Sequence, residues 1–131
     1  MATDTSETSV LADFAGRPVK FELRLGEIGE LERRCSAGIG EILIRLAAHR
    51  FYAHDVREPI RLGLIGGGES PAGAEALMRY NVDHVPLAEN LALAARIVEA
   101  CVSGVSAEGK AVAEGSSDAP ETSPPSTPPA A

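Results

Sequence analysis

Three histidines, His49, His54 and His84, carry the side chains of this sequence best suited to catalysis or metal binding. Asp55 follows His54 and Asp83 precedes His84, so imidazole and carboxylate groups occur together twice. Recognised zinc sites use Cys-rich or HExxH spacing, and the chain has neither. A histidine near the C-terminus of a helix commonly bonds free carbonyls, and an aspartate at a helix start caps free N–H groups. We therefore expect structural roles and no metal site.

The glycine triplet at 66–68 could cradle a phosphate group through its backbone. A phosphate loop needs a preceding strand and a following Gly-Lys-Ser/Thr, and neither is indicated here. Glycine between two helical patterns more often ends one helix and allows the next to begin. The triplet therefore predicts a linker, with no bound nucleotide.

Glu27, Glu30 and Glu32 could act as paired acids. Their spacing scatters them around a short helix that also carries Arg33 and Arg34, which favours solvated ion pairs over general acid–base chemistry. Serine nucleophiles are not indicated either, because no serine lies in a GxSxG turn. We expect a protein that has no catalytic site and no cofactor and that works by binding.

Length and composition limit the fold and the partners. A chain of 131 residues holds one domain. Hydrophobic residues make up 44% and aromatic residues 4%, with no Trp, so the core must be aliphatic. The net charge of −7 argues against nucleic acid as a partner, because such domains cluster Lys and Arg against phosphates.

No apolar stretch reaches the roughly 18 residues of a membrane span, and the first residues, MATDTSETS, lack the features of a signal peptide. We expect a cytoplasmic protein with no membrane contact. Cys35 and Cys101 have no CxxC spacing and no secreted context. They are expected to pack as small apolar residues without forming a disulfide.

Three regions follow from patterning along the chain. Residues 1–9 are polar and predicted to be flexible. Residues 10–104 are predicted to form an α+β, mainly α, domain with an N-terminal β-hairpin followed by about five short helices. The hairpin would pair residues 10–14 with 19–25, where apolar and charged residues alternate at period two. Residues 105–131 are an acidic, Pro-, Ser- and Ala-rich tail that we expect to be disordered.

Helical spacing of apolar residues gives the helices. They are expected at 28–35, 39–50, from about 55 or one turn later to 65, 71–80 and 86–103. Glu30 and Arg34 should pair at i,i+4. Asp55 would cap the third helix while Glu58 reaches back, which places Pro59 at the edge of the first turn. Ser70 and Pro71 indicate a capped helix start.

The segment Leu23-Arg24-Leu25-Gly26-Glu27-Ile28-Gly29-Glu30-Leu31-Glu32 resembles the opening of the phage and gene-transfer-agent tail assembly chaperone family, also labelled phage tail tube protein. In that family a strand ends in Leu-x-Leu-Gly and passes into an Ala/Leu/Glu helix. The resemblance continues through 40–46, 50–56, 60–68 and the Ala-rich helix at 87–102, and covers about residues 10–104. Pro59, Gly29 and the Pro-rich tail depart from the family pattern.

The resemblance implies a non-enzymatic chaperone that binds the aggregation-prone tape-measure protein, or another tail protein, during tail assembly. The alternative is a structural tail component, tube or adaptor, of a phage or gene-transfer-agent particle. A homo-oligomer is also considered, and the third hypothesis is an enzyme or metal-dependent regulator that uses the three histidines. The apolar residues expected to divide between a small core and a partner are Ile39, Ile42, Leu43, Leu46, Ile60, Leu64, Leu87, Leu91 and Val98.

Overall fold

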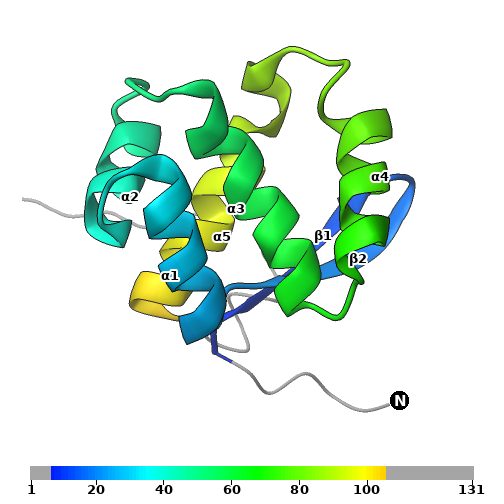
Figure 1. The fold of residues 1–131 in the computed structure, drawn as a ribbon, viewed down its shortest axis with the longest axis horizontal. Helices are drawn as coiled ribbons and strands as arrows, with labels where there is room; N and C mark the ends of the chain where they lie inside the picture. Colours follow the sequence, from blue (N-terminus) through cyan, green and yellow to red (C-terminus); the bar gives the residue numbers. More distant parts are fainter. Residues whose placement is uncertain (1–6, 106–131) are drawn as a thin grey trace, which may run out of the picture.

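The computed structural model describes residues 7–105, which form a hairpin followed by helices (Figure 1). The strands are β1 (Ser9–Phe14) and β2 (Arg17–Glu22). The helices are α1 (Leu25–Cys35), α2 (Ile39–Ala47), α3 (Ala53–Gly66), α4 (Pro71–Asn81), the 3₁₀ helix η1 (Leu87–Asn90) and α5 (Leu91–Ser103). The predicted fold class, α+β and mainly α with an N-terminal hairpin, is confirmed. Apart from Val105, the tail predicted to be disordered lies outside the described residues, as do residues 1–6 of the predicted flexible N-terminus.

The hairpin is closed by the two residues Ala15 and Gly16, whose φ angles are 56° and 82°. Positive φ at both central positions is the geometry of a type I′ turn, which matches the twist of the flanking strands. The register pairs Val10 with Phe21 and Asp13 with Pro18. Both strands begin or end earlier than predicted, since β1 starts at Ser9 and β2 ends at Glu22.

One face of the hairpin packs on the helices and forms part of the core. The rings of Phe14 and Phe21 meet edge to face, with centroids 5.4 Å apart. The rest of the core is aliphatic, as the composition predicted. Its largest fully buried apolar side chains are Phe21, Leu23, Leu31, Ile42, Leu46, Val56, Ile60, Leu64, Met78, Ile97 and Val98.

Two helix boundaries in the first half differ from the prediction. α1 begins at Leu25, three residues before the predicted start, because the Glu27 carboxylate accepts a hydrogen bond from the N–H of Arg24 at 2.9 Å. α2 ends at Ala47, before the predicted end at residue 50. There His49 takes a left-handed conformation with φ 58°, and the N–H of Arg50 donates to the carbonyl of Arg45 at 2.9 Å. Backbone groups therefore close this helix end in a Schellman-type arrangement.

α3 begins earlier than predicted and runs through its proline. Its first residue is Ala53, and Asp55 lies at the third position, where the carboxylate accepts the N–H of Tyr52 at 2.8 Å. Asp55 therefore reaches back to the cap, which is the part predicted for Glu58. Pro59 lies inside the helix at a buried position, so its predicted place at the edge of the first turn is wrong.

The start of α4 matches the prediction. Ser70 accepts the N–H of Gly73 at 3.0 Å, with Pro71 as the first residue of α4. This confirms the predicted hydroxyl cap. The last predicted helix is divided, since Pro86 precedes η1 and α5 begins only at Leu91. No helix within residues 7–105 is both long and apolar enough to span a membrane.

α3 lies at the centre of the domain and packs against β2, α1, α4 and α5 (Figure 1). α5 packs against α2, α3 and β1. The C-terminal end of α3 lies directly against β2. A Cβ atom at Gly66 would lie 1.8 Å from the carbonyl oxygen of Glu22, and one at Gly67 would lie 2.1 Å from that of Lys20. The triplet is thus a helix end, as predicted, and also a backbone-to-backbone contact that the sequence did not reveal.

Candidate interaction surface

The nine residues expected to divide between core and partner are distributed as follows. Five are at most 1% exposed and belong to the core, namely Ile42, Leu46, Ile60, Leu64 and Val98. Three are partly buried against that core, namely Ile39, Leu43 and Leu91. Leu87 is 37% exposed. The five core residues offer no surface to a partner in this fold, because packing of the domain itself covers them. Partner binding stays a prediction for the four that reach the surface.

The large apolar side chains that the described residues do expose are mostly different ones. They are Leu11, Leu25, Ile44, Tyr52, Tyr80, Leu87 and Val102. Ile44 and Tyr52 line the same hollow of about 380 Å³, between α2 and the start of α3. We name this surface the α2–α3 corner, formed by Glu41, Ile44, Arg45, Ala48, Arg50 and Tyr52.

The sequence contained a signal for Ile44, although this residue lies outside the predicted apolar stripe. The core-facing stripe of α2 uses positions 39, 42, 43 and 46, which leaves Ile44 on the opposite side of the helix. An isoleucine on the polar side of an amphipathic helix is informative, because it has no core to enter. Tyr52 had no such signal, since its exposure depends on where α3 begins.

A buried ion pair between Arg45 and Asp55 holds the residues of the α2–α3 corner in place. Asp55 has no exposed surface, and Nη1 of Arg45 lies 3.1 Å from its Oδ1 and 3.2 Å from its Oδ2. The same carboxylate accepts the N–H of Tyr52. A buried carboxylate without a cation would be strongly destabilising. Asp55 therefore fixes Arg45 and the backbone of Tyr52 relative to each other.

The aromatic ring of Tyr52 contacts two neighbouring side chains. The guanidinium carbon of Arg45 lies 5.2 Å from the ring centroid, a cation–π distance. The ring of His54 stacks on the ring of Tyr52, with centroids 5.6 Å apart and planes inclined at 18°. Tyr52 is nevertheless 62% exposed, and so is Ile44. The corner thus presents a positioned aromatic ring and an aliphatic side chain to solvent.

The folded chain brings Cys35, His54 and Asp55 together, with potential ligand atoms all within 4.8 Å. Burial and the neighbouring Asp55 carboxylate raise the pKa of the Cys35 thiol to about 12. A metal ion would have to remove that proton and displace Arg45 from Asp55. Both changes oppose metal binding, so the existing contacts account for Cys35 and Asp55 as buried structural groups and for His54 as a neighbour of Tyr52. The sequence could not pair Cys35 with Asp55, because they come from different helices.

The other residues considered for chemistry lie apart from this cluster. Asp83 accepts hydrogen bonds from Nε and Nη2 of Arg57 at 2.8 and 3.0 Å, and these bonds lower the pKa of Asp83. His49 and His84 are exposed, and the end of α2 is closed by backbone groups instead of by the predicted His49 side chain. Asp83 therefore links the loop after α4 to α3.

Two of the three acids of α1 are in ion pairs, as predicted. Glu30 contacts both Arg33 and Arg34, and its Oε2 lies 2.7 Å from Nε of Arg34. Glu27 pairs with Arg24. Glu32 instead accepts the N–H of Ile39 at 2.8 Å, which joins α1 to the start of α2. These carboxylates hold α1 and its connections in place.

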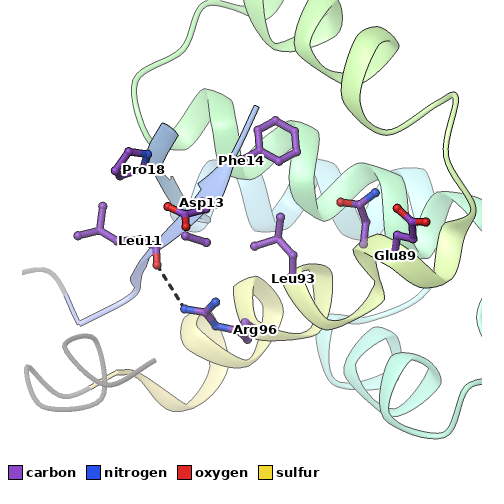
Figure 2. Close-up of a pocket in the computed structure, with 9 residues that line it drawn as sticks. Leu11, Asp13, Phe14, Pro18, Glu89, Leu93 and Arg96 are labelled. Carbon is purple, nitrogen blue, oxygen red and sulfur yellow. Dashed lines mark hydrogen bonds between the residues drawn. The ribbon is translucent and has the colours of Figure 1, made fainter. Parts of the chain in front are cut away.

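A second surface follows the outer edge of β1 (Figure 2). A groove of about 490 Å³ lies between this strand and the start of α5. Figure 2 shows Leu11, Asp13 and Phe14 on the strand side and Glu89, Leu93 and Arg96 on the helix side. Nη2 of Arg96 donates to the carbonyl of Leu11 at 3.3 Å. We name this surface the β1 groove.

The described residues define a small, mainly helical α+β domain in which a two-stranded hairpin covers one side of a helical core. The model of the family described as phage tail tube protein, GTA-gp10, matches residues 7–104. The chain belongs to this family. The predicted resemblance to phage and gene-transfer-agent tail proteins is thereby confirmed, whereas the description does not include an assembly chaperone. No curated protein and no solved structure matches the chain.

Proposed function

We propose that the chain is a structural component of a phage-like tail that attaches to other tail proteins through the α2–α3 corner. Membership of the tail tube family over residues 7–104 is the observation that carries this proposal. The protein would act by contact alone, without catalysis and without a cofactor. In support, the acids considered for acid–base chemistry and the Cys35 thiol considered as a metal ligand are engaged in contacts within the domain.

The corner has the chemistry of an interface centre. Tyr and Arg are enriched among residues that dominate binding energy, and such residues act best when they are held in place before binding. Arg45 and His54 already hold the ring of Tyr52, so little side-chain freedom would be lost on contact. Ile44 adds apolar area that the domain itself leaves open. A partner with an apolar pocket beside a carboxylate would complement this surface.

The protein content of purified particles tests the structural role. A tube or adaptor component must be present in each particle in a fixed number of copies. Quantitative mass spectrometry should therefore find the chain at a constant ratio to the other tail proteins. Absence from particles that are complete and infective, or that transfer genes, would overturn the structural role.

An assembly chaperone is the second candidate. Among residues 7–105 the sheet has only two strands, whereas stacked tube rings require extensive β-structure, and this observation favours a chaperone. A chaperone would bind the apolar tape-measure protein before the tube encloses it. Co-expression should then raise the soluble fraction of the tape-measure protein. An unchanged soluble fraction would count against this candidate.

Substitutions in the corner test the surface itself under either candidate. Ile44→Glu and Tyr52→Ser should each reduce co-purification with co-expressed tail proteins by about tenfold or more, as expected for the centre of an interface. Tyr80→Ser is the matched control, because Tyr80 is 73% exposed on α4 and lies outside the corner. Equal recovery for all three variants would exclude the corner as the binding surface.

A further inference from the structure

The outer edges of β1 and β2 differ in what lies against their backbone groups. Asp13 pairs with Pro18, which has no N–H, so this is a pair whose backbone groups point away from the partner strand. Alternation then directs the backbone groups of Leu11 outward on β1 and those of Lys20 and Glu22 outward on β2. The bond from Arg96 to the carbonyl of Leu11 agrees with this assignment.

On β2 the outward carbonyls of Lys20 and Glu22 lie against Gly67 and Gly66. Among the helices of residues 7–105, none contacts the β1 edge through its backbone in this way. Within residues 7–105 the outward N–H groups of Leu11 and Asp13 have no hydrogen-bond partner, and Arg96 alone reaches the carbonyl of Leu11. An open strand edge of this kind is a template for pairing with another strand.

The β1 groove provides room beside this edge. Its helical wall carries Glu89, Leu93 and Arg96, which lie at i, i+4 and i+7 on one side of η1 and α5. Its strand wall carries Leu11, an apolar side chain that is 45% exposed. A groove between a strand edge and a helix accommodates an added strand, whose backbone bonds to the edge while its side chains contact the helix.

Charge along the groove changes sign from one end to the other. Asp13 and Glu89 supply carboxylates, whereas Arg96, which bonds to Leu11, supplies a guanidinium. Among the described residues Arg96 forms no ion pair. An antiparallel second copy reverses this order, so its negative end meets the positive end of the first. The groove is therefore complementary to itself.

We propose that β1 is a dimerisation edge, at which two copies of the chain join their hairpins into one four-stranded antiparallel sheet. The two-fold axis passes at Ala12. In this register Leu11 lies opposite the partner's Asp13, and Asp13 lies opposite the partner's Leu11. Each such pair exchanges two backbone hydrogen bonds, so two pairs form four.

The register also satisfies the side chains. The partner's Asp13 comes to lie opposite Leu11, beside the guanidinium of Arg96 that already contacts this residue. The two Leu11 side chains become diagonal neighbours on the outer face, where long apolar side chains reach each other. A two-stranded hairpin is marginal by itself, and four strands form a more stable sheet. This dimer does not depend on the proposed role in a tail.

Sedimentation velocity of the full chain over a range of concentrations tests the dimer. We expect a reversible monomer–dimer equilibrium that Leu11→Lys and Asp13→Pro each weaken at least about tenfold. Proline at position 13 removes an outward N–H and spares the hairpin ladder, as Pro18 does on β2. Val102→Lys is the control, because Val102 is 48% exposed at the end of α5 and outside the groove.

A charge exchange makes the test specific for the register. Asp13→Arg and Arg96→Glu should each weaken the dimer, and the double variant should restore it. Thermal unfolding of each variant at low concentration checks that the monomer still folds.

A chain that remains monomeric at all concentrations, or a dimer that none of the edge variants weakens, would overturn the proposal. So would a monomer whose edge variants lose binding to another tail protein, because the groove would then have a different occupant. Loss of the dimer with normal binding through the α2–α3 corner would leave the proposed function intact.

Discussion

The hairpin has two edges of the same length, yet among residues 7–105 a helix closes only the edge formed by β2. The β2 edge lies against the C-terminal end of α3, where Gly66 and Gly67 allow two backbones to approach within a distance that any side chain would prevent. The β1 edge lies beside α5, whose long side chains hold the helix backbone away and leave a groove. In this hairpin, a helix approaches the strand edge closely where the contact residues have no side chains.

The contacts at the two edges also differ in rigidity. At β2 the contact is between backbone atoms of two regular elements, one of which is the central helix of the domain. At β1 the contact is one hydrogen bond from the flexible side chain of Arg96. We therefore expect substitutions at the β2 edge to affect folding, and substitutions at the β1 edge to affect association.

The largest expected effect follows from adding a methyl group at the closed edge. Gly66→Ala would place a Cβ atom 1.8 Å from the carbonyl oxygen of Glu22, so α3 or β2 must move. We expect a loss of about 2–3 kcal/mol in the free energy of unfolding, at the upper end for overpacking. Urea denaturation measures it. Gly29→Ala is the control, because position 29 is inside α1 with open space around it, and it should stabilise by about 0.5–1 kcal/mol. An unchanged free energy of unfolding for Gly66→Ala would contradict the interpretation that α3 closes the β2 edge.

An intermediate effect on stability is expected from raising the pH, because the Cys35 thiol of α1 is buried against α3. The native pKa of Cys35 is raised to about 12, above the value of about 8.5 for an unfolded thiol. The unfolded chain therefore loses this proton first, and stability present below about pH 8.5 is lost as the pH rises towards 12. At pH 10 the loss from this group should be about 1–2 kcal/mol relative to pH 8.

Urea denaturation of wild type and Cys35→Ala at pH 8 and pH 10 isolates this contribution. The variant begins less stable, because it loses buried volume, but its stability should depend less on pH. Other groups that titrate in this range are common to both proteins and cancel in the comparison. If wild type and Cys35→Ala lost the same free energy of unfolding between pH 8 and pH 10, the Cys35 thiol would not contribute to the pH dependence of stability.

The smallest effect on folding is expected at the open edge. Arg96→Gln removes one hydrogen bond, 3.3 Å long and exposed, and should change the stability of the monomer by no more than about 0.5 kcal/mol. Thermal unfolding at low concentration measures this. A loss as large as that of Gly66→Ala would mean that Arg96 closes the β1 edge as firmly as α3 closes the β2 edge, and the contrast between the edges would fail.

Local patterns were sufficient for the elements themselves. Alternation at period two predicted the hairpin, and Ser70 with Pro71 predicted the start of α4. The i,i+4 spacing predicted the pair of Glu30 and Arg34. Boundaries were less accurate. α3 begins before Asp55 and continues through Pro59, because the packing of a central helix outweighs the loss of one backbone hydrogen bond.

The interaction surfaces were harder to predict than the elements. An apolar stripe shows that a helix has a covered face, but it does not show whether the cover is the same domain or a partner. Five of the nine stripe residues entered the core, whereas Ile44, outside the stripe, is exposed. The position of Tyr52 depends on Asp55 and Arg45, which are brought together from two helices.

Residue order alone was enough to predict the class of fold, the order of its strands and helices, the aliphatic nature of the core and the resemblance to phage-like tail proteins. These properties depend on residue types and on spacings within one element or between neighbours. The packing of the folded domain was needed to show which apolar residues remain exposed, which carboxylate meets which guanidinium, and which edge of the hairpin stays open. Those outcomes depend on distances between residues far apart in the chain, such as Gly66 and Glu22, and no local spacing encodes them.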